Sequence, residues 1–89
     1  MKAIITVIGK DKVGIVSAIS LELAKLNINI LDISQTIMDE NFTMIMLVDL
    51  NESTSSFEQI KNILIEVSDK LNINIRIQRE EIFKSMHTI

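Results

Sequence analysis

The five letters LNINI occur twice in this chain, at Leu26–Ile30 and again at Leu71–Ile75, which lies 45 residues further on. An internal repeat of that length matters for the fold, because each copy then belongs to one supersecondary unit. Each copy follows a stretch of helical periodicity and precedes a stretch of strand character. Since Asn tolerates the left-handed conformation that ends many helices, LNINI predicts a helix end, a turn and a strand start.

Helical periodicity precedes both copies of the repeat. Before the first copy, apolar residues recur at spacings of four, four and three: Ile15, Ile19, Leu23 and Leu26. Before the second copy, they alternate three and four apart: Phe57, Ile60, Leu64, Val67 and Leu71. Such spacing places one apolar stripe along a helix. Asp11 is well placed as N-cap of the first helix, and Ser55 with Glu58 fits a capping box at the second.

Four short stretches have strand character and flank the two helices: Lys2–Ile8, Ile28–Met38, Phe42–Leu50 and Ile73–Arg79. The expected order is β-α-β-β-α-β, two βαβ halves related by the repeat. Right-handed crossovers place both helices on one face of a four-stranded antiparallel sheet of order 4-1-3-2, the α+β ferredoxin-like sandwich. We expect residues 1–81 to form one domain and residues 82–89 a tail that packs on the domain or on a partner. Chance recurrence in an Ile- and Asn-rich chain is the alternative, and the matching helical stripes argue against it.

The composition limits the class of protein. The chain has 89 residues, 47% of them hydrophobic, no cysteine and a net charge of −3. These values fit one domain with an aliphatic core, exclude disulfides and thiolate metal sites, and give no support to polyanion binding. The apolar run at the N-terminus is too short for a signal peptide, and no run approaches the roughly 18–20 residues of a membrane span. We expect a cytoplasmic protein that binds neither nucleic acid nor membrane.

Several functions of ferredoxin-like domains need residues that this chain lacks. RNA-recognition domains stack bases on aromatic side chains of the sheet, but the first and last expected strands carry none. A metal carrier needs paired cysteines in the first loop, and a phosphate-cradling enzyme needs an arginine where this chain has Lys10 and Lys12. The one histidine, His87, lies in the tail, and we find no catalytic constellation. We therefore expect no enzymatic activity and no cofactor.

The repeat is broken at the loop GKDKVG, which runs from Gly9 to Gly14 and shares nothing with the second half. Both glycines of the protein lie there. In one interpretation they are structural: Gly9 ends a strand, and Gly14 lets the helix start pack close to the sheet. In the other, Gly14 lets a ligand approach the backbone. The sequence leaves both interpretations open.

The loop and the second strand together offer groups that suit a free amino acid. Unpaired amides at the start of the first helix form an anion site for a carboxylate. Asp11 beside them, with Asn29 and Asp32 on a strand expected to start next to the loop, supplies oxygens for an ammonium group. Each also has a structural alternative: Asp11 as a helix cap, Asn29 as a turn residue mirrored by Asn74, and Asp32 as a solvated side chain.

These residues resemble the start of a known family. GKDKVGIVSAIS followed by LNINILDISQTIM is similar to the opening of an ACT domain: a strand, a G-x-D-x-x-G loop, a helix and an N-I strand. The resemblance covers residues 1–81 and is greatest to small single-domain ACT proteins of bacteria and archaea akin to glycine-cleavage regulatory proteins. It implies a dimer that binds amino-acid-type ligands between the first loop of one subunit and strand two of its neighbour.

The resemblance points to Asp11, Gly14 and Asn29 as ligand-binding residues. With their neighbours, the candidate ligand-binding residues are Asp11, Lys12, Val13, Gly14, Ile15, Asn29, Ile30 and Asp32. One departure concerns the ligand. Amino-acid-binding members often have a polar side chain where this chain has Gly9, so one ligand contact is absent here.

A dimer is also expected from the edges of the sheet. The last strand carries Arg76 and Arg79, whereas Ile28–Met38 contains no Lys, Arg or Pro. An unprotected apolar edge predicts pairing with another chain, here a homodimer with an eight-stranded sheet. Two functions follow: a non-catalytic sensor of an amino acid or similar metabolite that signals to a regulated partner, or an interaction module without a small ligand.

Overall fold

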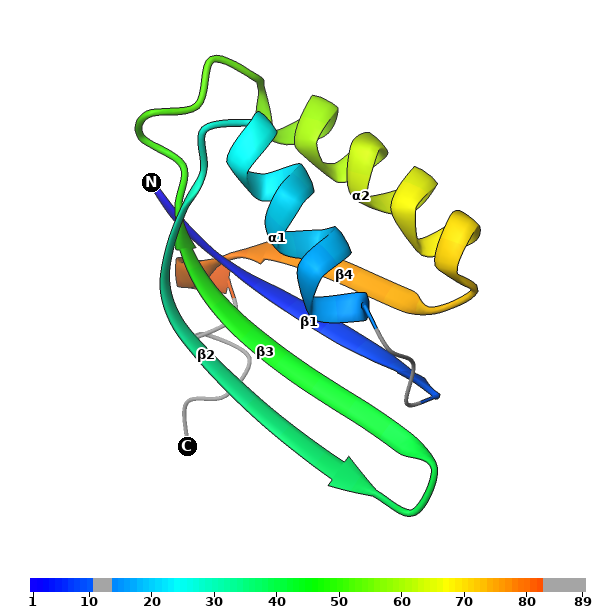
Figure 1. Cartoon of the computed structure of the whole chain (residues 1–89). Coiled ribbons are helices and arrows are strands. Elements are labelled where there is room, and N and C mark those ends of the chain that lie inside the picture. Colours follow the sequence, from blue (N-terminus) through cyan, green and yellow to red (C-terminus); the bar gives the residue numbers. More distant parts are fainter. Residues whose placement is uncertain (11–13, 83–89) are drawn as a thin grey trace.

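The computed structural model describes residues 1–10 and 14–82, so Asp11, Lys12, Val13 and the segment 83–89 lie outside the described residues. The elements are β1 (Lys2–Lys10), α1 (Ile15–Lys25), β2 (Asn29–Met38), β3 (Asn41–Asp49), α2 (Phe57–Leu71) and β4 (Asn74–Arg79) (Figure 1). The predicted order β-α-β-β-α-β is confirmed. The strand boundaries differ from the expected ones by one or two residues, as is usual where strands end in turns.

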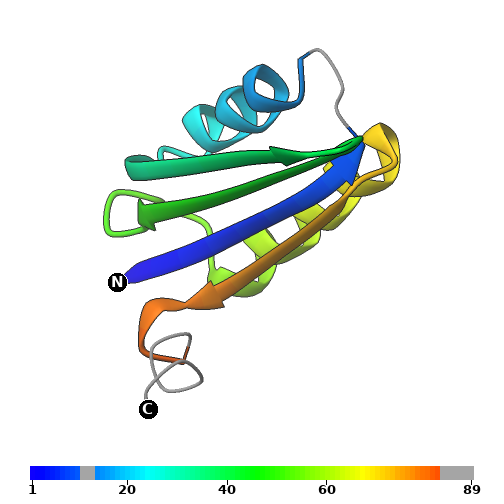
Figure 2. The same ribbon diagram turned by 90° about the horizontal axis from the view of Figure 1, so that it is seen from below.

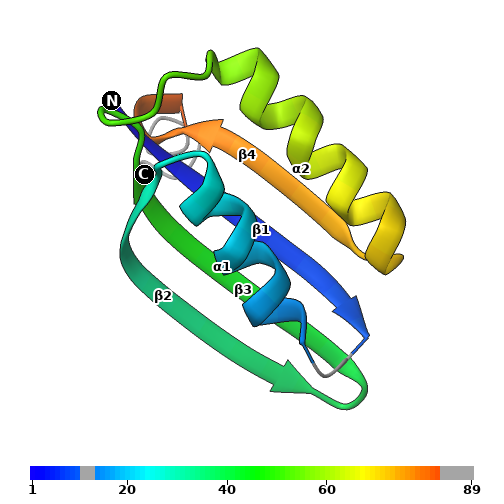
Figure 3. The ribbon, with the colours of Figure 1, turned by 45° about the horizontal axis from the view of Figure 1, so that its top comes forward.

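The four strands form one antiparallel sheet of order β2-β3-β1-β4. This is the predicted order 4-1-3-2 counted from the other edge of the sheet. Figure 2 shows the strands side by side in that order. Both helices lie on the same face of the sheet (Figure 3). The ferredoxin-like sandwich is therefore confirmed, with β2 and β4 as its edges.

The core lies between the helices and the sheet, and it uses alternate residues of each strand because side chains alternate across a sheet. The strands contribute Ala3, Ile5, Val7, Phe42, Met44, Met46, Val48, Ile75 and Ile77. The helices contribute Ile15, Ile19, Leu23, Ile60 and Leu64. The repeat-related pairs Ile15 with Ile60 and Ile19 with Leu64 are all buried, so the repeat is a repeat of the core.

The two LNINI segments end their helices in the same way. Asn27 has φ 59° and Asn72 has φ 56°, both in the left-handed region. The Ile after each Asn donates its N–H to a helix carbonyl, that of Leu23 at 2.9 Å in the first copy and that of Ser68 at 3.0 Å in the second. These two acceptors are themselves 45 residues apart. The predicted helix-ending role of LNINI is confirmed, since each copy satisfies carbonyl groups that a helix end leaves free.

The start of α2 corrects one prediction. The capping box is formed by Ser56 and Gln59, one residue later than the predicted Ser55 and Glu58. The Ser56 hydroxyl accepts the Gln59 N–H at 3.2 Å, and the Ser56 N–H donates to Gln59 Oε1 at 2.8 Å. Ser55 instead donates its N–H to the Ser53 hydroxyl at 3.3 Å, which makes it part of the preceding turn. Consecutive serines allow either register, and the turn selects the later one.

Candidate functional site

The start of α1 has a glycine at the N-cap and no side-chain cap from the described part of the chain. The N-cap of α1 is Gly14, with φ 93°, and no side chain of the described residues donates to or accepts from this helix start. The prediction that Asp11 is the N-cap is therefore wrong, and its side chain lies outside the described residues. Ala18 is the first helix residue whose N–H donates within the helix, to the Gly14 carbonyl at 2.9 Å. The amides of the first turn before Ala18 have no intrahelical acceptor, which makes this end of α1 suited to an anion.

The two glycines serve different purposes, and neither is the one that the structural interpretation predicted. Gly9 does not end a strand, since it lies within β1 and pairs with Phe42. A Cβ at Gly9 would lie 2.6 Å from Cγ2 of Ile73, the residue that leads into β4. Gly9 is thus required by the close approach of another chain segment, and a polar side chain at this position would displace Ile73.

Gly14 has no such neighbour. A Cβ built on Gly14 would have no described atom within 4 Å, so close packing of the helix start against the sheet is not its role. Its φ of 93° is one that L side chains rarely adopt. The residue is exposed, so the backbone at the start of α1 is open to approach from solvent.

The start of β2 does not lie beside this loop, contrary to the prediction. Asn29 and Lys2 both pair with Asp49, whereas Lys10, which leads into the loop, pairs with Asn41. Lys2 and Lys10 are eight residues apart along β1, which corresponds to about 26 Å of strand at ~3.3 Å per residue. The reason is the crossover: α1 carries the chain back, so β2 starts at the same end of the sheet as β1. Within one chain, Lys10 therefore lies at the far end of the sheet from Asn29.

The other predicted site residues have local roles in this structure. Ile15 is buried in the core at 2% exposure, and Ile30 packs against the core. Asp32 is exposed, lies opposite Leu47 in the register, and accepts the Ile33 N–H through Oδ1 at 2.9 Å. The structure therefore groups Gly14 and Ile15 at one end of the sheet and the three β2 residues toward the other.

A cavity of about 380 Å³ borders the loop on the side of β4. It is lined by Ile8, Gly9, Lys10, Asn41, Asn72, Ile73 and Asn74. None of these is among the candidate ligand-binding residues, and sequence analysis missed the cavity. Its only sequence signal is that Asn72 and Asn74 belong to the second LNINI, which the fold brings beside Lys10.

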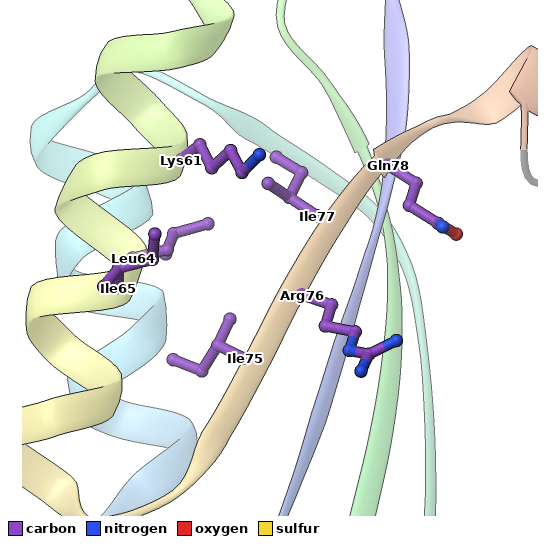
Figure 4. Close-up of a pocket in the computed structure, with 7 residues that line it drawn as sticks. All are labelled: Lys61, Leu64, Ile65, Ile75, Arg76, Ile77 and Gln78. Atoms are coloured by element: carbon purple, nitrogen blue, oxygen red, sulfur yellow. The ribbon is translucent and has the colours of Figure 1, made fainter.

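A second cavity of about 230 Å³ lies between α2 and β4 (Figure 4). Leu64, Ile75 and Ile77 give it an apolar floor, and Lys61 reaches over it from α2. Arg76 also borders it, but Figure 4 shows its side chain pointing away from the helix. Polar groups do not converge on this cavity from the residues drawn, which favours a packing defect over a site.

Two further observations concern the described ranges 1–10 and 14–82. Within them, no three His, Cys, Asp or Glu side chains gather as a metal site would require. None of the helices there combines the length and the apolarity needed to cross a membrane.

The outer edge of β2 is open along the described chain, because β2 pairs with β3 alone. Residues 31–37 are all exposed, and the large apolar ones are Leu31 (43%), Ile33 (37%) and Ile37 (58%). The register slips at Leu31, so this residue forms a bulge and leaves Asp32–Met38 as a regular edge. An open edge with apolar side chains and without a positive charge is the kind that pairs with another strand.

The fold defines a ferredoxin-like α+β domain in which an exposed glycine precedes a helix that no described side chain caps. The chain belongs to the ACT domain family, whose model matches residues 2–78. ACT domain proteins are typically regulatory, and the match indicates no catalytic family.

Similar proteins support the same assignment. A UPF0237 protein of Clostridium acetobutylicum is 61% identical over 89 residues, which covers 100% of both chains. The structure of an ACT domain protein from Streptococcus pneumoniae superimposes with a TM-score of 0.83 at 46% identity and covers 94% of each chain. A putative glycine cleavage system transcriptional repressor has a TM-score of 0.77 at 22% identity, over 88% of this chain and 44% of that one. The last likeness is one of fold.

Proposed function

We propose that this chain is a non-catalytic regulatory domain that binds an amino acid or a similar small metabolite between two copies of itself. Binding would change the stability of the pair relative to its other arrangements, and a partner protein would detect that change. The observation that carries the proposal is the separation of the two halves of the candidate site. The uncapped start of α1 and Asn29 lie at opposite ends of one sheet, so one copy holds only half of the site.

A two-fold dimer through β2 would bring the two halves together. Two identical edge strands related by a two-fold axis run antiparallel, so the start of one β2 lies beside the end of the other. The end of β2 is at the same end of the sheet as the GKDKVG loop, because Met38 and Lys10 both pair with Asn41. Asn29 of the second copy would then approach the loop of the first, and the same contact would form at the other end of the dimer.

The chemistry of the completed site suits an α-amino acid. The first-turn amides of α1 would donate to its carboxylate, and the open backbone at Gly14 allows close approach. The amide oxygen of Asn29 in the second copy, together with Asp11, would accept from its ammonium group. Asp32 accepts the Ile33 N–H through Oδ1, and its other carboxylate oxygen would be a further acceptor for the ammonium group.

A thermal-shift screen against the twenty amino acids tests the proposal. A ligand at ~100 times its Kd adds about 2.7 kcal/mol of stability, which for a domain of this size is a rise in Tm of about 10–20 °C. Asn29→Ala should abolish the shift. Asn74→Ala is the matched control, since Asn74 is the repeat equivalent of Asn29, begins β4 and is exposed. A shift lost only in Asn74→Ala would instead locate the ligand in the cavity that Asn74 lines.

The dimer is tested separately by light scattering. Ile37→Lys should give a monomer and should remove the ligand shift, because the site needs two copies. Ile65→Lys is the control, because Ile65 is also an exposed isoleucine (44%, against 58% for Ile37) and lies on α2, which packs beside β4 and not beside β2. A monomeric parent chain at micromolar concentration would contradict the proposal, as would a ligand shift that survives Ile37→Lys.

The second candidate is an interaction module without a small ligand. The open β2 edge favours it, since strand pairing needs only free backbone groups and apolar side chains. A dimer that shows no shift with any amino acid would support this function over the sensor.

A further inference from the structure

The cavity of Figure 4 adjoins a neighbouring one, and the two form a groove along β4. The neighbouring cavity has a volume of about 260 Å³ and is lined by Phe57, Glu58, Ile77, Gln78, Arg79 and Ile82. Ile77 and Gln78 border both cavities, which places them side by side. A packing defect is a single gap, whereas this hollow follows β4 from Ile75 to Arg79. We refer to the two cavities together as the β4 groove.

The β4 groove lies between an edge of the sheet and one face of a helix. Among the described strands, β4 pairs with β1 alone and is therefore an edge strand. α2 runs beside β4 and packs on it (Figure 3). On α2, the groove is lined by Phe57, Lys61 and Ile65, which follow one another at intervals of four and so share one face of the helix.

The walls of the β4 groove are largely apolar. Ile75 and Ile77 form the floor and are 8% and 9% exposed, while Ile65 and Ile82 border it and are 44% and 47% exposed. An apolar groove along an edge strand suits an extended peptide that joins the sheet. In that mode of binding, main-chain hydrogen bonds give affinity and pockets for alternate side chains give specificity.

The two faces of β4 indicate which side chains such a peptide needs. Ile75 and Ile77 belong to the core and face the helices, whereas Arg76 between them points away from α2 (Figure 4). Side chains directly opposite one another on neighbouring strands lie on the same face of the sheet. Residues opposite the two isoleucines would therefore enter the groove and should be apolar. The residue opposite Arg76 would lie on the other face and should be acidic.

The charge of the β4 groove also favours an acidic segment. Of the described residues that line it, Lys61, Arg76 and Arg79 are basic and Glu58 is acidic, although the whole chain has a net charge of −3. The Arg79 guanidinium lies over the Phe57 ring, 4.9 Å from its centroid. Lys61 and Arg76 form no ion pair with a described residue. These two side chains can thus attract the carboxylate of a bound segment.

We propose that the β4 groove binds an extended segment of a partner protein as a fifth strand of the sheet. The segment has an acidic residue between two apolar ones: the acidic residue lies beside Arg76, and the apolar residues enter the groove. Arg76 disfavours pairing of β4 with a second β4 through like charge, and it selects a segment of opposite charge. Because β2 is the opposite edge of the sheet, the groove stays open in a β2 dimer, and its role is independent of the ligand site.

Fluorescence anisotropy with the labelled peptide Ser-Thr-Ile-Asp-Ile-Thr-Ser tests the charge pattern. The parent chain should bind it saturably and should bind the peptide with Lys in place of Asp about tenfold more weakly, because that Lys would face Arg76. Arg76→Glu should reverse the preference. Lys25→Glu is the matched control, since it makes the same change in net charge at an exposed residue of α1 and should keep the parent preference.

Two N-methylated peptides test strand pairing, one methylated at both Ile residues and the other at Asp and the Thr that follows the second Ile. Alternate N–H groups of a strand point to opposite edges, so only one of the two peptides should lose binding. Equal affinity of both would overturn the proposal. Amide chemical shifts of the parent chain should change most along β4 and at Ile65, and changes concentrated on β2 would mean that the peptide adds to the other edge.

Other outcomes also decide against the β4 groove as a peptide site. The proposal fails if the parent chain does not bind the acidic peptide saturably, or if the preference for that peptide survives Arg76→Glu. If circular dichroism shows that Arg76→Glu does not fold, Arg76→Ala should weaken the preference without reversing it. A preference left unchanged by Arg76→Ala would then overturn the proposal.

Discussion

Gly9→Ala adds one methyl group at the closest approach between β1 and the segment leading into β4. The new Cβ would lie 2.6 Å from Cγ2 and 3.0 Å from Cβ of Ile73, where carbon atoms normally sit about 3.5–4.0 Å apart. Both Ile73 atoms are close to its backbone, so a change at the end of the side chain cannot relieve the contact. Ile73 also packs against the core, so the segment must shift and disturb its neighbours.

The cost follows from two opposing contributions. Overpacking a filled site costs about 1–3 kcal/mol, and replacing Gly by Ala within a strand returns roughly 0.5–1 kcal/mol of backbone entropy. The backbone adds no penalty of its own, since Gly14 is the only described glycine with positive φ. Because a contact of 2.6 Å is severe, the upper part of the overpacking range applies, about 2–3 kcal/mol. We therefore expect Gly9→Ala to lower the free energy of unfolding by about 1–2.5 kcal/mol, which corresponds to a fall in Tm of roughly 4–20 °C.

A double-mutant cycle with Ile73→Ala tests whether the contact with Ile73 causes the destabilisation by Gly9→Ala. Ile73→Ala removes the atom nearest to the new methyl group, so the double variant should be more stable than the sum of the single effects predicts, by about 0.5–3 kcal/mol. The measurement is urea unfolding followed by circular dichroism. An additive cycle, or a Gly9→Ala variant as stable as the parent, would refute the contact as the reason for this glycine.

Three other substitutions test separate parts of the structure by the same unfolding measurement. Gly14→Ala should lower the free energy of unfolding by about 1–2 kcal/mol because of its φ of 93° alone. Since no described atom lies within 4 Å of a Cβ at Gly14, Ile73→Ala should not restore the lost stability. Ser56→Ala removes the hydroxyl that accepts the Gln59 N–H and should cost about 0.5–2 kcal/mol; no loss would mean that the capping box is dispensable. Leu64→Ala opens a cavity at a residue that is 1% exposed, and a loss below the expected 2–5 kcal/mol would show that the core collapses around it.

Much of the fold could be predicted because it rests on short-range rules. The spacing of Ile15, Ile19 and Leu23 specifies which side of α1 is buried, since 3.6 residues make one helical turn. Asn27 and Asn72 end the helices because Asn tolerates the left-handed conformation. The repeat then determined the topology, because right-handed crossovers leave few ways to arrange two βαβ halves.

Predictions about single residues failed where a contact from a distant part of the chain, or a neighbouring residue able to take the same role, determines which residue caps a helix. Asp11 fits the composition of an N-cap, but α1 starts later, at an exposed glycine with φ 93°. Ser55 fits a capping box as well as Ser56 does, and a turn bond from Ser55 to Ser53 excludes the earlier register. Local composition cannot rank such alternatives, because both serines satisfy the same local rule and a hydrogen bond in the preceding turn selects between them.

The sequence by itself thus determined the order of the elements, the helix ends and the buried stripes, all of which depend on residues a few positions apart. Only the tertiary structure decided that Gly9 faces Ile73 across the strands. The tertiary structure also corrected the position of Asn29, which lies at the far end of the sheet from the loop because the two strands of a βαβ half run parallel. Both facts depend on how α1 and α2 return the chain across the sheet, and a crossover relates residues far apart in sequence through the packing of the whole domain.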